Sequence, residues 1–324
     1  SGAQRDSWWT KNDDGEWITS NRIHQDIVGA LMLTNGNKGY QYSFTAQLDK
    51  KFSYGFSGML AYTHSISKIS STNPGDASAS AWSSNACVNS LNYPELGYAN
   101  FSVPNRVMGA LTYSHELDKA FGFSLSLYYS GSAQDRYSYT YKNDLNGDGN
   151  ASDLMYIPTG ADDINFVDIV NSEGAVVSTA AQQAEALMNY INNDKYLSAN
   201  KGKYAERFAA VGPWINRIDA KALINLFTNF GSDKRYTLQL SLDCYNIGNL
   251  FNSEWGVYKY HGLGTNNFIQ LVKFAGMEEG GETPTPTYQL NATSVEQFNA
   301  DAKFMNNVIL SNAWQMLVGI RLLF

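Results

Sequence analysis

The most specific chemical pattern in the sequence is a run of oxygen-bearing side chains that begins at residue 144. Asp144, Asn146 and Asp148 occupy the first, third and fifth positions of a calcium-loop pattern, and Gly149 occupies the sixth. In such loops alternate side-chain oxygens converge on the ion, and the glycine permits a sharp turn. Asn150 would add its backbone carbonyl oxygen. This spacing favours Ca²⁺ as the ligand.

The calcium pattern fails at its C-terminal end. The last position, where a bidentate Glu is expected, is Met155, and Asp153 is the nearest additional carboxylate. A polar turn whose side chains bond their own backbone explains the same residues. We therefore expect at most weak Ca²⁺ binding within 144–153, and we predict no other cofactor. The candidate ligands are Asp144, Asn146, Asp148, Asn150 and Asp153.

Sequence motifs for catalysis are absent. The chain has no Gly-x-Ser-x-Gly elbow, no His-Glu-x-x-His pair, no Walker loop and no Cys-x-x-Cys. Cys87 and Cys244 lie far apart and fit neither a disulfide framework nor a zinc site. The histidines are scattered, at His24, His64, His115 and His261. We expect that the chain is not an enzyme.

Composition excludes several classes of protein. The 324 residues include 23 basic and 30 acidic side chains, for a net charge of -7, so the chain lacks the positive charge that nucleic acid requires. Charged residues make up only 16% and aromatic residues 14%. No stretch approaches the roughly 18 consecutive apolar residues of a membrane helix. We therefore expect a fold built from strands rather than from helices.

Period-two alternation of apolar and polar residues is the dominant pattern. It is clearest at the C-terminus, where Met316, Val318 and Ile320 share one parity and Gln315 and Arg321 the other. Alternation of this kind predicts strands that are apolar on one face only. Eight candidate strands result, over residues 26–35, 40–49, 53–66, 105–117, 121–130, 217–226, 235–245 and 314–324.

The lengths of the strands and of their connections distinguish a transmembrane β-barrel from a β-sandwich. The strands match the roughly 9 to 11 residues that cross a bilayer, and exceed the 5 to 6 usual in a β-sandwich. Short turns join strand ends at 49–51, 118–120 and 231–234, whereas long insertions join the opposite ends at 70–103, 142–214 and 248–312. One tight hairpin, 35–39, lies on the long side. This asymmetry is typical of an outer-membrane β-barrel with long extracellular loops.

Each face of the predicted sheet has its own role. Leu240, Ile224 and Val318 would contact hydrocarbon, and aromatic residues near strand ends, such as Tyr54 and Trp314, would lie at the headgroups. The opposite parity would face the barrel interior and could form an ion network. Its lumen-facing polar residues are Arg217, Asp219, Lys221, Gln239, Asp243 and Arg321. A helix-compatible run, 178–192, lies within one long insertion.

Several blocks of the sequence resemble a known family. The terminal residues 321–324 resemble the aromatic end of bacterial outer-membrane barrels. More narrowly, nearly the whole chain resembles the C-terminal barrel portion of Oar-like TonB-dependent outer-membrane transporters. The matching blocks are 33–35, 39–50, 143–149, 153–158, 196–197, 202–207, 213–214 and 246–256. Residues 275–312 are the least similar.

The resemblance implies a location, a fold and partners. A transporter of this family would have a 22-stranded barrel in the bacterial outer membrane, closed by an N-terminal plug, and would import a nutrient. Partners would be lipid and lipopolysaccharide, the rest of the barrel, the plug, TonB through the N-terminal part, and a surface lipoprotein. Residues 1–324 would form one C-terminal barrel segment without the plug.

An alternative remains: a complete eight-stranded barrel that acts in surface binding or adhesion, or as a subunit of an outer-membrane complex. Pairing of 26–35 with 313–324 would support this smaller barrel.

Overall fold

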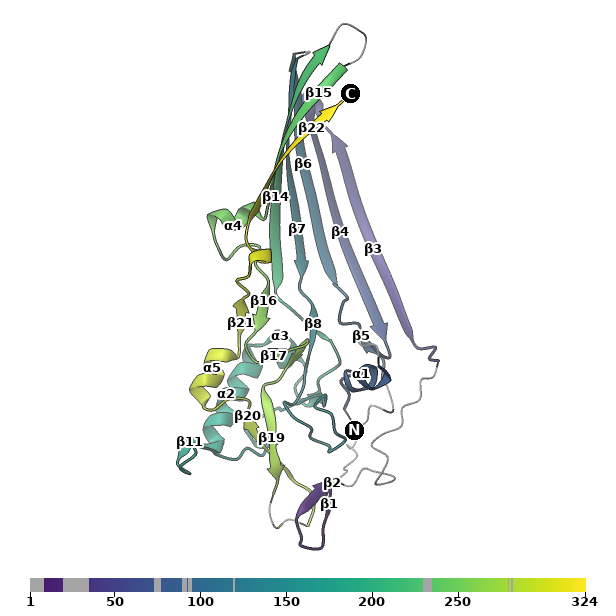
Figure 1. Ribbon diagram of the computed structural model, residues 1–324. Helices are drawn as coiled ribbons and strands as arrows, with labels where there is room; N and C mark the ends of the chain where they lie inside the picture. Colours follow the sequence, from purple (N-terminus) through teal and green to yellow (C-terminus); the bar gives the residue numbers. More distant parts are fainter. Residues whose placement is uncertain are drawn as a thin grey trace.

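The computed structural model describes residues 9–19, 35–72, 77–88, 92, 95–118, 120–229, 235–278, 280 and 282–324. The chain is mostly β-sheet, and almost all of its strand pairs are antiparallel. Figure 1 shows two parts: a tall sheet of long strands, and a layer of small elements at one end of it. We call this second part the cap. No helix among the described residues is long and apolar enough to cross a membrane.

Seven long strands form the sheet. They are β3 (Gly39–Lys51), β4 (Phe56–Ile69), β6 (Asn105–Asp118), β7 (Phe121–Ala133), β14 (Trp214–Asn229), β15 (Arg235–Tyr245) and β22 (Gln315–Leu323). Their order is β22-β15-β14-β7-β6-β4-β3, and the two-residue strand β5 (Gly97–Tyr98) also pairs with β4. Seven of the eight predicted strands are therefore confirmed. The eighth prediction, 26–35, falls almost entirely outside the described residues.

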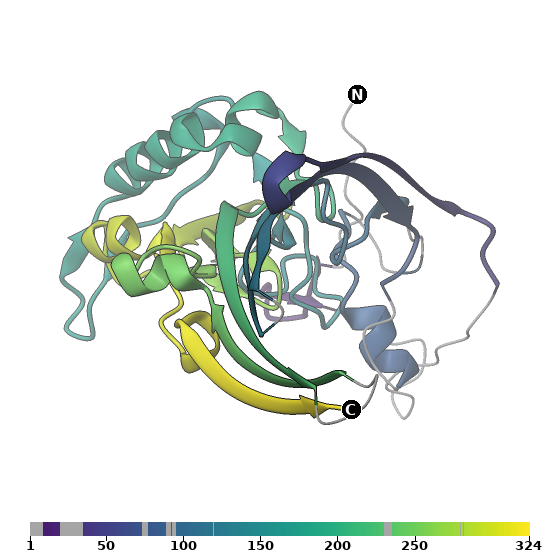
Figure 2. The same cartoon turned by 90° about the horizontal axis from the view of Figure 1, so that it is seen from above.

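Alternation fixes the register of the sheet. Small hydroxyl side chains share one face of neighbouring strands and bond across them: Thr45 to Thr63 at 3.0 Å, and Ser114 to Ser124 at 2.8 Å. A shift of one residue would exchange every apolar side chain with a polar one, so the pattern specifies a single register. The sheet curves as an open arc whose edges are β3 and β22 (Figure 2). The described strands therefore do not form a closed barrel.

Short turns join the strands at the end far from the cap. Between β3 and β4, the turn contains the 3-10 segment η1 (Ser53–Gly55), in which Tyr54 has φ 64° and Gly55 has φ 84°. A Cβ atom at Gly55 would lie 2.1 Å from the carbonyl oxygen of Ser114. Only glycine fits this left-handed position against the neighbouring strand. A short connection at this end is confirmed, but its predicted position, 49–51, is wrong, because these residues still belong to β3 and pair with β4. The turn lies at 52–55, and the strand predicted from residue 53 begins at Phe56.

Long connections leave the opposite ends of the strands and build the cap (Figure 1). They run over residues 70–104, 134–213 and 246–314, so the predicted asymmetry is confirmed. The cap strands are β8 (Arg136–Tyr139), β9 (Tyr156–Ile157), β10 (Ile169–Val170), β11 (Val176–Ser178), β12 (Lys203–Tyr204), β13 (Ala210–Val211), β16 (Lys259–His261), β17 (Gly264–Thr265), β18 (Phe268–Ile269), β19 (Val272–Met277), β20 (Pro286–Leu290) and β21 (Phe304–Asn306).

Helices occur only in the cap among the described residues. They are α1 (Ser78–Ser83), α2 (Ala180–Asn193), α3 (Lys195–Ala199), α4 (Ile247–Phe251) and α5 (Val295–Asp301), with 3-10 segments η2 (Ala161–Asp163) and η3 (Leu310–Asn312). The predicted helix within the second insertion is thus α2. It begins with a capping box in which Thr179 accepts from the Gln182 backbone and Gln182 accepts from the Thr179 backbone.

The buried apolar core lies in the cap. Leu187 and Ile191 of α2, Leu197 of α3, Leu271 and Phe298 are all fully buried in one cluster. These residues come from two connections that are far apart in the sequence. The N-terminal hairpin of β1 (Trp9–Lys11) and β2 (Trp17–Thr19) also touches the cap, because its first Trp donates from Nε1 to the carbonyl of Leu145 at 3.0 Å. The insertions therefore fold on one another as a packed layer.

Candidate functional site

One face of the long-stranded sheet is apolar and uncovered. Val318 and Ile320 of β22 are each 74% exposed, and Ile224 of β14 is 39% exposed. Leu240 on β15 is half-buried between them. The face continues to β3, where Phe44 is exposed. An apolar surface that spans seven strands exceeds what a monomeric protein normally presents to water, so an apolar medium or partner must cover it.

The opposite face carries the predicted ion network at the β14–β15 seam. Lys221 lies directly across from Asp243 in the register, and their side chains form an ion pair of 2.7 Å. Arg217 and Asp219 form a second pair, with 3.1 Å between Nε and Oδ1. Asp219 also accepts a hydrogen bond of 2.6 Å from the backbone N–H of Asn246. The four charges alternate in sign along one face.

The two remaining predicted residues lie on the same face. Gln239 of β15 donates from Nε2 to Oδ1 of Asn225 at 2.9 Å. Arg321 of β22 lies opposite Gln239 in the register. The structure therefore brings all six residues of the predicted network to one side of three adjacent strands. At these strands this side of the sheet is the more polar of the two.

The 144–153 turn is held by its own backbone. Asp144 accepts hydrogen bonds of 2.7 Å from the N–H groups of both Gly147 and Gly149. Asn146 and Asp148 accept from N–H groups two residues further on, at 3.0 and 2.9 Å. Burial, with a smaller contribution from the neighbouring Asp144 charge, raises the pKa of Asp148 above its usual value. This is the arrangement expected of a self-bonded polar turn.

Asp153 does not join the other acidic groups of the turn as a free ligand. Its Oδ2 accepts a hydrogen bond of 2.8 Å from the backbone N–H of Leu145. In the described part of the chain, no three His, Cys, Asp or Glu side chains form a group that could hold a metal ion. Ca²⁺ binding by Asp144, Asn146, Asp148 and Asn150 stays a prediction, and the chemistry of the turn does not require the ion.

A buried chain of hydrogen bonds joins two of the long connections. Tyr139 of β8 donates to Oδ2 of Asp194 at 2.9 Å, and its oxygen lies 3.4 Å from that of Tyr190 on α2. The Tyr190 hydroxyl lies 3.0 Å from Nε2 of His261 on β16. Asp194 also caps α3, because its other oxygen accepts from two backbone N–H groups. This series of hydrogen bonds therefore fixes α2 and α3 against β8 and β16.

His261 is held neutral in this chain. The backbone N–H of Leu263 donates to Nδ1 at 3.1 Å, so the ring proton must be on Nε2, from which it is donated to Tyr190. The side chain is 5% exposed, and burial lowers the pKa of His261 to about 4. A neutral ring is the form that this geometry accommodates, because a cation here would lose hydration without gaining a carboxylate partner.

Two buried arginines tie the connections to the sheet. Arg207 donates to the carbonyls of Ser70 at 2.9 Å and Glu95 at 3.0 Å, and also to that of Ile69 at the end of β4. Arg136 lies with its guanidinium carbon 4.1 Å from the ring centre of Tyr98. Burial lowers the pKa of both guanidinium groups from their usual value. Both remain cations whose charge is met by carbonyl oxygens and a ring face.

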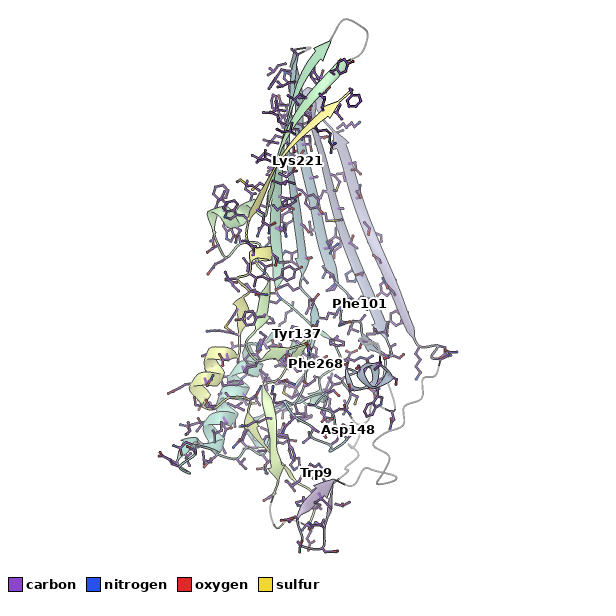
Figure 3. The ribbon with its side chains drawn as sticks, viewed as in Figure 1. Trp9, Phe101, Tyr137, Asp148, Lys221 and Phe268 are labelled. Carbon is purple, nitrogen blue, oxygen red and sulfur yellow. The ribbon has the colours of Figure 1, made fainter. Side chains whose placement is uncertain are left out.

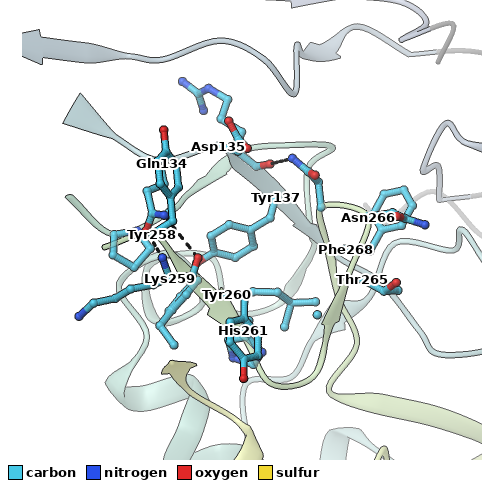
Figure 4. Close-up of a pocket in the computed structure, with 17 residues that line it drawn as sticks. Gln134, Asp135, Tyr137, Tyr258, Lys259, Tyr260, His261, Thr265, Asn266 and Phe268 are labelled. Carbon is cyan, nitrogen blue, oxygen red and sulfur yellow. Dashed lines mark hydrogen bonds between the residues drawn. The ribbon is translucent and has the colours of Figure 1, made fainter. Parts of the chain in front are cut away.

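A cleft of about 230 Å³ opens beside this network, and Figure 4 shows its lining. Tyr137, Tyr258, Tyr260 and Phe268 supply aromatic surface. Gln134 closes one side by exchanging two hydrogen bonds with the backbone of Lys259, at 3.4 and 3.3 Å. His261 lies at the floor, so the cleft and the buried chain share a residue. The lining combines these rings with charged and amide side chains, among them Asp135, Arg136 and Lys259.

Sequence reasoning missed the residues that organise the cap. His261 was one of four scattered histidines, and Arg136 and Arg207 belong to no motif. Several of their partners lie 70 or more residues away, as with Tyr190 and His261 or Arg207 and Ser70. No local spacing carries such a signal. Cys87 is half-buried and Cys244 is buried.

Comparison with known proteins gives no relative. No family model matches the chain, and no curated protein or solved structure matches it.

Proposed function

We propose that the chain forms part of the wall of an outer-membrane β-barrel transporter of the TonB-dependent kind, with the cap on the extracellular side. The observation that carries this proposal is the uncovered apolar face of the sheet. Val318, Ile320 and Ile224 are exposed on long paired strands, while the buried core lies in the cap. Hydrocarbon tails of lipid would cover this face without breaking any backbone pairing, because the five inner strands bond to a neighbour on both sides. The edges β3 and β22 would pair with further strands of the barrel.

Aromatic residues support the same placement. Phe52 and Tyr54 are exposed at the short-turn end of the sheet, and Trp314 is exposed where β22 leaves the cap. Rings with one apolar and one polar edge favour the headgroup region at both sides of a bilayer. The apolar band would then lie between two aromatic levels, as in other outer-membrane barrels.

The polar face favours a wide barrel over the closed eight-stranded alternative. In an eight-stranded barrel, side chains fill the interior. Here much of the polar face consists of small side chains, among them Ser57, Ser124, Ser126 and Thr112, which leave space above the sheet. The strand that would close the smaller barrel, near 26–35, lies outside the described residues.

In a transporter of this kind, the apolar face and the cap would each contact a different partner. Lipid and lipopolysaccharide would contact the apolar face, and a plug and further strands would complete the barrel. TonB would act through an N-terminal part, and a surface lipoprotein could cover the cap. The cap would meet the nutrient first. We propose no catalytic step, because the sequence contains no catalytic motif.

Cysteine labelling tests the orientation of the protein. Ser172 is exposed in the cap, and Tyr54 is exposed in the opposite turn. In a background of Cys87→Ser and Cys244→Ala, an impermeant maleimide should label Ser172→Cys on intact cells. It should label Tyr54→Cys only after the outer membrane is opened. Recovery of the protein in a soluble fraction, or labelling of Tyr54→Cys on intact cells, would contradict the proposal.

A further inference from the structure

A second cavity in the cap, of about 580 Å³, is lined without a single charged side chain. Its residues come from all three long connections: Ser83 at the end of α1, Ser152 after the acidic turn, Phe208, and Asn266 at the tip of the β17–β18 hairpin. The other lining side chains that can hydrogen-bond are likewise hydroxyls and amides. The volume lies within the range of small-ligand sites. We call it the neutral cavity.

The backbone of the neutral cavity is held in an unusual conformation. Phe208, Asn266 and Asn267 all have positive φ, at 51°, 47° and 67°. The two Asn residues make the tight turn of a hairpin that pairs with β8, and the Asn267 side chain donates to the carbonyl of Arg136 at 3.0 Å. Asn adopts this conformation readily in a two-residue hairpin turn, whereas for Phe208 it costs free energy and persists only where surrounding contacts impose it. The wall of the cavity is therefore built in advance of any ligand.

Ser138 and Arg136 impose the conformation of Phe208. The Phe208 backbone N–H donates to Oγ of Ser138 at 2.8 Å, and its carbonyl accepts from Arg136 at 3.2 Å. Its ring stacks on that of Phe268 with 5.9 Å between centres and an interplanar angle of 11°. Phe268 lines both this cavity and the cleft beside His261, as do Asn266 and Asn267, so both spaces are bounded by the β17–β18 hairpin.

An exposed aromatic ring lies next in sequence to the cavity lining. Phe101 is 65% exposed and directly follows Asn100, which lines the cavity. Figure 3 shows Phe101 at the level where the strands meet the cap. The ring is an exposed apolar surface in the same connection as Asn100, outside the lining of the cavity itself.

We propose that the neutral cavity binds uncharged oligosaccharide. The inference rests on the proposed function, since it names the class of nutrient that the cap would meet. Hydroxyl and amide side chains can each donate and accept, which suits the hydroxyl groups of a sugar ring. A charged ligand would lose hydration here and find no ion partner. A free peptide carries charged ends and would meet the same cost.

Binding measurements on the protein purified from outer membranes test the proposal. The probes are neutral gluco-, manno-, xylo- and N-acetylglucosamine oligosaccharides, an oligogalacturonate as the anionic probe, and a free Gly-Ala peptide with both ends charged. We expect saturable binding, by calorimetry, of at least one neutral sugar and of neither other probe. Asn266→Gly keeps the left-handed turn but removes the amide, so it should weaken sugar binding by about 2- to 12-fold.

Ser172→Ala provides the matched control, because Ser172 is exposed in the cap and does not line the cavity. It should leave sugar affinity unchanged. The proposal is overturned if no neutral sugar in the panel binds, if the anionic probe or the peptide binds in its place, or if Asn266→Gly binds as well as Ser172→Ala does. These outcomes are independent of the labelling experiment, since a protein shown to lie in the outer membrane can still fail to bind sugar.

Discussion

Replacing Val318 with Arg tests the central physical claim, which is that lipid covers the apolar face. Val318 lies within β22, is 74% exposed, and pairs with Leu242 on the same face. In hydrocarbon an Arg at this depth should cost about 2 to 4 kcal/mol of folding free energy. That corresponds to about a 30- to 700-fold change in the folding equilibrium. In water the same change at an exposed site should alter stability by no more than about 0.5 kcal/mol.

The adjacent residue supplies a matched control. Leu317 is also exposed, but it lies on the opposite face, across from Asp243. Leu317→Arg should therefore be neutral, or stabilising by up to about 1 kcal/mol through a weak ion pair. Both variants add the same side chain to the same strand. Only the face differs between them.

Folding into lipid vesicles provides the assay. Urea titration of each variant, followed by the gel shift of the folded form, gives the free energy of unfolding. We expect Val318→Arg to be less stable than Leu317→Arg by at least about 2 kcal/mol. Equal stability of the two variants would refute the assignment of lipid to the apolar face.

Three further predictions concern the cap. Burial lowers the pKa of His261 from 6.5 to about 4, so the free energy of unfolding of the cap should be highest above pH 6.5 and should fall by up to about 3 kcal/mol as the pH is lowered to 4. Hydrogen exchange should show this loss of stability in the natural protein and not in His261→Gln. Arg207→Met should destabilise the cap by about 2 to 5 kcal/mol in thermal unfolding, because carbonyls of two connections lose their donor, and Arg207→Lys should not restore it. The pKa of Asp148 is raised, so its negative charge opposes folding at neutral pH, and Asp148→Asn should be slightly more stable than the natural protein in chelator. If the turn binds Ca²⁺, the order of stability should reverse in millimolar Ca²⁺, because the ion stabilises only the natural protein. Calorimetry would detect the binding of Ca²⁺ directly.

The sheet could be predicted from the sequence because its information is local. Strand faces follow from the parity of residues such as Val318 and Leu317. The end of β3 was predicted a few residues too early, since the turn lies at 52–55 and not at 49–51. Antiparallel neighbours along the chain pair with each other, so the polar residues of β14 and β15 had to share one face. The ion pair of Lys221 with Asp243 follows directly from parity and register.

The cap could not be predicted, since its contacts join residues that are distant in sequence. His261 meets Tyr190 across 71 positions, and Arg207 meets Ser70 across 137. Short strands such as β8 and β18 pair in parallel and carry no clear alternation of their own. Burial, rather than sequence spacing, keeps His261 neutral. Burial also leaves the carbonyl groups around Arg207 dependent on its guanidinium for hydrogen bonds. Burial is a property of the packed layer, and no segment of the chain determines it alone.

A two-faced antiparallel sheet with long insertions at one end is encoded locally, because alternation and turn chemistry act over a few neighbouring residues. The packing of the insertions into one layer is evident only from the folded structure. The same is true of the meeting of Asn266, Phe208 and Ser152 around an uncharged cavity. Whether residues of the three long connections meet depends on how these connections pack against one another. Packing free energy between distant segments sets that outcome.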